Sequence, residues 1–203
     1  MHKKTLTVLF LSAFLVPALL AFDSKAQESP LQGLFKDNFI LLPEPLPGPA
    51  TPVKDLSGKD VTFSDFHGEL VLLNFWATWC APCVAEMPSL ERLQIHFEGQ
   101  PFRVLAVSLD RQGTQKVLPF LKRLGLERLQ ILLDPRGHLS REVVVSGLPT
   151  TYLINQDGQI LGGLLGPAEW DSEDAIALIE YYLKTPDAVQ EAESGDEEAK
   201  KGS

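Results

Sequence analysis

Residues 70–88 read LVLLNFWATWCAPCVAEMP. The first seven residues are almost all apolar, which is typical of a β-strand buried on both faces of a sheet. After this strand we expect a helix from Cys80 towards Phe97, with Pro88 as a kink inside it. Cys80 and Cys83, the two cysteines of the chain, then stand at the start of a helix. A C-x-x-C pattern in this strand-to-helix context predicts a redox-active pair.

Cys80 is the expected nucleophile of the pair. The unpaired N–H groups and the macrodipole at a helix N-terminus stabilise a thiolate, and the thiolate is the form that attacks disulfides. Cys83 lies one helical turn further on, within reach to displace a mixed disulfide. Pro82, between the two cysteines, limits the backbone freedom of the first helical turn.

Two other uses of the cysteine pair are less favoured. A zinc or iron site needs further ligands, and His67, His96 and His138 are scattered singly along the chain. A purely structural disulfide between Cys80 and Cys83 would close a very short loop, so it would remove little entropy from the unfolded chain. We therefore expect redox chemistry by the cysteines themselves, with no metal and no cofactor.

The chain of 203 residues has the composition of an ordinary globular protein, with 44% hydrophobic and 22% charged residues. Its length suits one domain with appendages. It carries 27 acidic and 18 basic residues, a formal net charge of −9. Because phosphate binding needs clustered Lys and Arg, this acidic chain is not expected to bind nucleic acid.

Shifts in composition along the chain predict four parts. Residues 1–26 have a basic start and an apolar run, as in a signal peptide or a membrane anchor. Either interpretation places the rest outside the cytoplasm, in the periplasm. Residues 27–52 hold six of the 15 prolines and predict a stiff linker, whose apolar patch 39–42 can dock as an extra edge. Residues 53–184 form the expected domain, and the acidic tail 185–203 is expected to be disordered.

Further strand and helix signals follow the cysteine motif. Strands are expected at 102–109, 129–133, 151–154 and 160–165, and helices at 114–124 and from Asp171 or Ser172 to Tyr182. Upstream, 53–56 and 61–63 flank a turn signal and predict a hairpin. This order predicts an α/β fold with a central mixed sheet flanked by helices and an N-terminal β-hairpin extension.

The cysteine motif also carries a family resemblance. Residues 74–88, Asn-Phe-Trp-Ala-Thr-Trp-Cys-Ala-Pro-Cys-x-x-Glu-x-Pro, resemble the thioredoxin superfamily and, within it, the extracytoplasmic TlpA/ResA/DsbE group. The resemblance covers residues 53–182 and includes Asp55–Gly58 and Gly147–Thr151. It implies a thioredoxin-like fold and the activity of a thiol–disulfide oxidoreductase.

The resemblance implies a proton acceptor at Glu86. Cytoplasmic thioredoxins carry a buried Asp on the strand where this chain has Asn74, which cannot accept a proton near neutral pH. In the TlpA/ResA/DsbE group that role falls to a Glu three residues after the second cysteine, and Glu86 occupies this position. On a helix, Cys83 and Glu86 lie on neighbouring faces. The alternative is a solvated Glu on the helix surface.

The resemblance also implies a surface that binds the partner protein. In the family, the proline at the position of Pro149 is cis and faces the active-site disulfide. The residue before it, here Leu148, offers backbone hydrogen bonds to a bound partner. We expect Trp79, beside the nucleophile, and Pro82 to line the same surface. Trp76, on the buried strand, is expected to be part of the core.

These features predict an exported thiol–disulfide oxidoreductase that reduces disulfides in other exported proteins. The family suggests clients of the cytochrome c or copper-site assembly type, and a membrane electron donor that restores the dithiol. Two alternatives stay open: a disulfide oxidase or isomerase, and a Cu(I)-binding assembly module, since paired thiolates suit Cu(I). The copper alternative lacks an obvious third ligand, because Met87 is the only methionine besides Met1.

Overall fold

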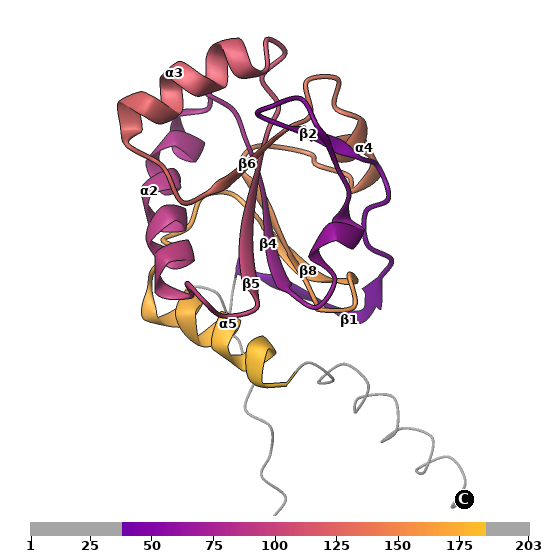
Figure 1. Ribbon diagram of the computed structural model, residues 1–203. Coiled ribbons are helices and arrows are strands. Elements are labelled where there is room, and N and C mark those ends of the chain that lie inside the picture. The colour runs from indigo at the N-terminus through magenta and orange to yellow at the C-terminus, as the bar shows by residue number, and fades with distance from the viewer. Residues whose placement is uncertain (1–37, 186–203) are drawn as a thin grey trace, which may run out of the picture.

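The computed structural model describes residues 38–185, which form one mixed β-sheet with helices on both faces (Figure 1). The predicted signal or anchor 1–26, the first part of the predicted linker and residues 186–203 of the predicted tail lie outside the described residues. Between residues 38 and 185, none of the helices has the length and apolar character needed to cross a bilayer.

Within the described residues the sheet has eight strands in the order β1-β8-β7-β4-β5-β6-β2-β3. The strands are β1 (Ile40–Leu46), β2 (Val53–Asp55), β3 (Asp60–Val61), β4 (Leu70–Trp76), β5 (Phe102–Ser108), β6 (Gln130–Leu133), β7 (Thr150–Ile154) and β8 (Ile160–Leu165). The helices are α2 (Ala81–His96), α3 (Thr114–Leu124), α4 (His138–Glu142), α5 (Glu173–Lys184) and the short 3-10 helix η1 (Phe63–Phe66). Strands β4, β5 and β6 run parallel to one another, and the other neighbouring strands are antiparallel.

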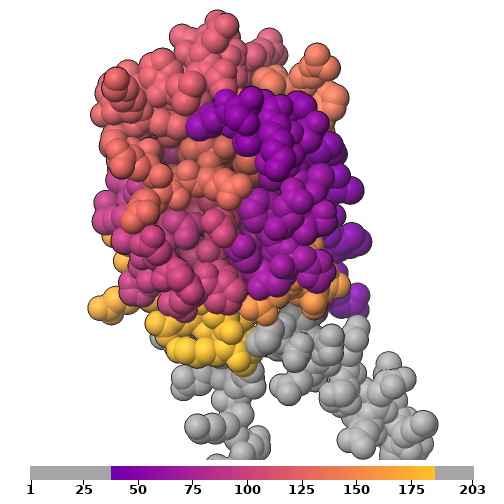
Figure 2. All heavy atoms as spheres, viewed as in Figure 1, coloured from indigo at the N-terminus to yellow at the C-terminus, as the bar shows by residue number. Residues whose placement is uncertain are grey.

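Strand β4 lies between β5 and β7, and all seven of its residues are buried. Because side chains alternate between the two faces of a sheet, Leu72 packs in one hydrophobic core and Leu73 in the other. Helices α2, α3 and α5 cover the first face, and α4 with η1 covers the second (Figure 1). In the space-filling view, the indigo and purple N-terminal part covers the right flank and α5 lies at the bottom (Figure 2). The predicted mixed sheet flanked by helices is confirmed.

Part of the predicted linker belongs to the sheet. Residues 40–46 form the edge strand β1, which pairs with β8 through Ile40 opposite Gly163 and Leu41 opposite Gly162. The backbones approach so closely that a Cβ at Gly162 would lie 2.3 Å from the carbonyl oxygen of Ile40. The two prolines inside β1 are tolerated because an edge strand needs hydrogen bonds on one side only. The folded domain therefore begins before Val53, and these residues are not a spacer.

Helix α4, which the sequence does not predict, ends in an unusual backbone conformation. Val144 follows it with φ of +59°, in the left-handed region that β-branched residues rarely adopt. Val145 N donates to Ser140 O at 2.8 Å, and Val144 N donates to Arg141 O at 3.3 Å. These two bonds form a Schellman motif, in which glycine usually takes the position of Val144.

Val144→Gly is expected to raise the free energy of unfolding by about 1 kcal/mol, because it removes the steric cost of left-handed backbone. Little packing is lost, since the Val144 side chain is 75% exposed. Urea unfolding of the variant and the wild type measures the difference. Val143→Gly is the matched control: its φ of −89° suits any residue, so glycine there is expected to destabilise. A destabilised Val144→Gly would contradict this explanation.

Candidate active site

The two cysteines lie at the N-terminus of α2. Cys80 is the N-cap residue, and its Sγ accepts a hydrogen bond from Cys83 N at 3.3 Å. In the structure the pair forms a disulfide, with Cα atoms 5.3 Å apart. Cys83 is fully buried and Cys80 is 6% exposed. Cys80 is therefore the cysteine that a client disulfide reaches more easily.

Asp110 fixes the loop that carries the cysteines. It is buried just beyond β5, the parallel neighbour of β4. Its carboxylate accepts hydrogen bonds from Thr78 N at 2.9 Å, from Thr78 Oγ1 at 2.7 Å and from Ser108 Oγ at 2.8 Å. The sequence predicts Asp110 only as the boundary of a strand. An acidic residue directly after a buried strand could, however, have indicated a side chain that holds the neighbouring loop by hydrogen bonds.

Glu86 is buried on α2, with 2% of the residue exposed, and does not lie on a solvated surface. Its Oε1 accepts a hydrogen bond from Asn74 Nδ2 at 2.8 Å. Its Oε2 accepts from Ala168 N at 3.1 Å and from Trp170 Nε1 at 3.3 Å. Burial raises the pKa of Glu86 to about 7, and the three hydrogen bonds oppose this rise. A carboxyl group with a pKa near neutrality can both take up and release a proton at physiological pH.

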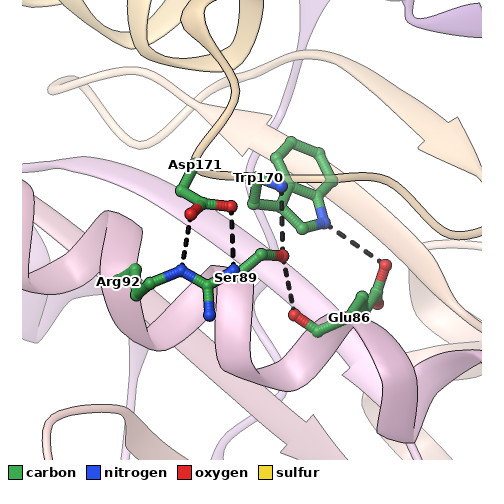
Figure 3. A network of polar contacts seen from close by, with 5 residues as sticks. All are labelled: Glu86, Ser89, Arg92, Trp170 and Asp171. Carbon is green, nitrogen blue, oxygen red and sulfur yellow. Dashed lines mark hydrogen bonds and ion pairs between the residues drawn. The ribbon is translucent and has the colours of Figure 1, made fainter.

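The donors to Oε2 come from the segment Gly166–Asp171, which joins β8 to α5 and packs on α2. Figure 3 shows the residues of α2 that face it, Glu86, Ser89 and Arg92. Ser89 Oγ accepts from Trp170 N at 3.1 Å, and the guanidinium of Arg92 donates to both carboxylate oxygens of Asp171 (Figure 3). Sequence reasoning missed Trp170, because its bond to Glu86 joins positions 84 residues apart.

Asn74 links Glu86 to strand β7. It is the ladder partner of Thr151, and its Nδ2 donates to Thr151 Oγ1 at 2.9 Å as well as to Glu86. The buried Oδ1 of Asn74 has no hydrogen-bond partner among residues 38–185. The side-chain amide therefore turns its nitrogen towards two acceptors and leaves its own acceptor unused.

The peptide bond between Leu148 and Pro149 is cis, as the resemblance implies. Phe75 pairs with Thr150 in the β4–β7 ladder. The cis dipeptide, directly before Thr150, therefore lies next to the end of β4, from which the cysteine loop departs. Leu148 is half-buried and Pro149 is buried.

Trp79 and Pro82 are the exposed residues of the predicted partner surface. Trp79 is 70% exposed. Together with Arg111 and Lys116 it lines a hollow of about 500 Å³ beside the cysteine loop. A large exposed aromatic side chain next to a reactive group is typical of a surface that contacts another protein.

For metal binding, the described residues offer the cysteine pair and no larger group of ligands. Among residues 38–185, no three His, Cys, Asp or Glu side chains are grouped as a metal site. Cys80 and Cys83 are joined to each other in this structure, so both sulfurs are already bonded.

A mixed sheet that delivers two cysteines to the first turn of a helix, next to a cis-proline, is the arrangement of the thioredoxin-like fold. With its cysteines able to close a disulfide, the protein falls in the class of thiol–disulfide oxidoreductases. More narrowly, the chain belongs to the AhpC/TSA family, whose sequence pattern matches residues 46–162.

Individual relatives agree with this assignment. The chain is 34% identical to the thiol-disulfide oxidoreductase ResA of Bacillus subtilis (strain 168) over 140 residues, 69% of this chain and 70% of that protein. A putative thiol:disulfide interchange protein DsbE from Chlorobium tepidum superposes with a TM-score of 0.63 and 31% identity, covering 69% of this chain and 97% of that one. For StoA from Bacillus subtilis the TM-score is 0.51 and the identity 27%, covering 64% and 92%. The predicted family, fold and enzyme class are confirmed.

Proposed function

We propose that the protein reduces disulfides in client proteins outside the cytoplasm. The observation that carries this proposal is the buried Glu86, a carboxyl group with a pKa of about 7 on the helix that begins with the cysteine pair, which suits it to accept a proton. Export is supported by residues 1–26, whose basic start and apolar run suit a signal peptide or a membrane anchor. The residues between this segment and β1 then serve as a short spacer, and the acidic tail stays solvated.

The proposed reaction transfers two electrons from the dithiol to the client. The Cys80 thiolate attacks one sulfur of the client disulfide, forms a mixed disulfide and releases a client thiolate. Glu86 takes the proton from the Cys83 thiol, and the Cys83 thiolate attacks the Cys80 sulfur. This step releases the second client thiolate and leaves the disulfide form seen here. The client thiolates are protonated by water and by the proton that Glu86 gives up.

The client would be held on the surface around the cysteine loop. Trp79 and Pro82 offer exposed apolar contacts, and Leu148, before the cis-proline Pro149, offers backbone hydrogen bonds to an extended client segment. The resemblance to the TlpA/ResA/DsbE group supports clients of the cytochrome c or copper-site assembly type. It also supports a membrane electron donor that returns the disulfide to the dithiol.

A protein that reduces client disulfides needs a low reduction potential for its own Cys80–Cys83 disulfide. Strong oxidants of this kind stabilise the reduced thiolate, whereas Ala81 and Pro82, between the cysteines, supply no positive charge, and Glu86 opposes a thiolate once ionised. We expect a potential of roughly −200 mV or lower, measured by equilibration with glutathione or dithiothreitol buffers. A value near about −120 mV would overturn the reductase proposal and favour the disulfide oxidase.

A further inference from the structure

The two oxygens of the Glu86 carboxylate have different kinds of partners. Oε2 accepts from a backbone N–H, that of Ala168, and from the indole N–H of Trp170. Both groups can only donate. Oε1 accepts from the side-chain amide of Asn74, which can present an oxygen in place of its nitrogen. A proton on Oε2 would therefore face two donors, whereas a proton on Oε1 can find an acceptor.

The donors to Oε2 are held in place by the same segment of chain. Trp170 is fully buried, and its backbone N–H is fixed on α2 by Ser89 Oγ. One residue further on, Asp171 forms a two-pronged ion pair with Arg92, one turn along α2 from Ser89 (Figure 3). The backbone of Trp170 is thus held on α2 by its own N–H and by the side chain of the next residue, and its indole N–H points at Glu86.

We propose that Trp170 is a positioning residue, which reserves Glu86 Oε2 as an acceptor and confines the proton taken up from the cysteine pair to Oε1, facing Asn74. This inference rests on the proposed function, in which Glu86 is the proton acceptor. When Oε1 is protonated, the Asn74 amide turns over, so that its Oδ1 accepts a hydrogen bond from the Oε1 hydroxyl, which keeps the proton. The hydroxyl of Thr151, which now accepts from Nδ2, then donates to the same Oδ1.

The orphaned Oδ1 of Asn74 fits this account. A buried acceptor without a partner has a free-energy cost, and Oδ1 has none among residues 38–185 while Nδ2 serves two acceptors. After the amide turns, Oδ1 accepts from Glu86 Oε1 and Thr151 Oγ1, and the Nδ2 amino group, which gives up these two acceptors, takes the buried position that Oδ1 occupies now. Asn74 can therefore follow either protonation state of Glu86 without losing its contact to Thr151, which a carboxylate at this position could not do.

Few charges act on Glu86 besides its own. Glu169, in the same segment as Trp170, raises the pKa of Glu86 by its charge. On α2, the reduced Cys83 thiol would stand one turn before it, and on β4 and β7 the facing groups are the uncharged Asn74 and Thr151. A change in the pH profile of a Trp170 variant can therefore be assigned to the lost hydrogen bond, provided that Glu169 is retained.

The test compares two buried tryptophans in the full chain. Trp170→Phe is expected to move the pH profile of exchange with glutathione disulfide about one unit to higher pH, because a charge-assisted hydrogen bond to the carboxylate is lost. Trp76→Phe is the matched control: Trp76 is equally buried, and its Nε1 has no partner among residues 38–185. An equal shift in both variants, or none in Trp170→Phe, overturns the proposal.

A measurement on the wild type keeps the proposal testable if Trp170→Phe fails to fold. In an NMR titration of the reduced protein, the Asn74 side-chain amide signals are expected to change with the same midpoint as Glu86 Cδ. The Trp170 indole proton is expected to stay hydrogen-bonded throughout. A Trp170 signal that loses its hydrogen bond at this midpoint, with Asn74 unchanged, would place the proton on Oε2 and overturn the proposal.

Glu86→Gln separates this inference from the proposed function. If Glu86→Gln removes the pH dependence of exchange and Trp170→Phe does not move it, the positioning role is overturned and the proton acceptor stands. If Glu86→Gln also leaves the profile unchanged, the acceptor role fails and the positioning role fails with it. The reduction potential, measured separately, decides the direction of the reaction in either case.

Discussion

Cys80→Ser is expected to reduce disulfide reduction to the uncatalysed level, whereas Cys83→Ser is expected to accumulate a mixed disulfide with the client. The two cysteines differ in position: Cys80 caps α2 and accepts the N–H of Cys83, and Cys83 is fully buried behind it. Attack therefore needs Cys80, and release of the client needs Cys83. Serine keeps the size of the side chain, so the fold is expected to persist in both variants.

The Cys83→Ser variant is incubated with an extract that contains client proteins, and the mixed disulfide is then measured on non-reducing gels and by mass spectrometry. The double variant, which has no thiol, is the control and should trap nothing. Alkylation of the reduced wild type at pH 7 provides a second readout, with Cys80 modified first. Faster alkylation of Cys83 would mean that the two roles are reversed.

Glu86→Gln is expected to slow thiol–disulfide exchange at pH 7 about 100-fold, because the proton acceptor for the second thiol is lost. The pH dependence of the rate should flatten, and a thiol pKa should fall, since an ionised Glu86 no longer opposes the thiolate. Glu91→Gln is the matched control. Glu91 is also buried on α2, but its carboxylate binds the backbone N–H groups of Glu127, Arg128 and Leu129, so its loss should leave the pH profile unchanged.

Glu86→Gln is also expected to change how the free energy of unfolding depends on pH. The pKa of Glu86 is about 7 in the folded protein and 4.5 as the ordinary value. Between these values the folded state binds more protons than the unfolded state, so the free energy of unfolding falls as the pH rises, by about 3 kcal/mol in all. Relative to the wild type, Glu86→Gln should therefore gain stability by about this amount between pH 4.5 and pH 8. Urea unfolding at both pH values measures it, and a constant difference would contradict the raised pKa.

Elements with strong local signals were predictable from the sequence. Helix α3 has the predicted bounds because Gly125 ends it in the left-handed conformation, with φ of +68°, which glycine adopts at no steric cost. Strand β4 is recognisable from seven consecutive residues that suit burial on both faces. The hairpin of β7 and β8 follows from a turn at Asn155–Gln159. In each case residues close in sequence supply the signal.

Features that depend on distant partners were not predictable. The sequence predicted that residues 39–42 dock as an extra edge, and Ile40 and Leu41 do pair at the edge of the sheet. It did not predict that their partner is β8, more than 100 positions away, or that the strand continues through two prolines to Leu46. Asp110 and Trp170 act through Thr78 and Glu86, and only the packed sheet and α2 bring these pairs together. For Glu86 the motif pointed to the residue, but its burial depends on the Gly166–Asp171 segment folding back on α2.

The edge strand β1 bears on the solubility of the protein. An open strand edge offers a row of N–H and C=O groups that recruits strands from other molecules and promotes aggregation. Strand β1 covers this edge of β8, and within β1 Pro43 and Pro45 have no N–H groups to offer another strand, while Glu44 exposes a charge. The sheet therefore ends on this side in a strand poorly suited to further pairing, and a shortened chain beginning at Val53 would lose that protection.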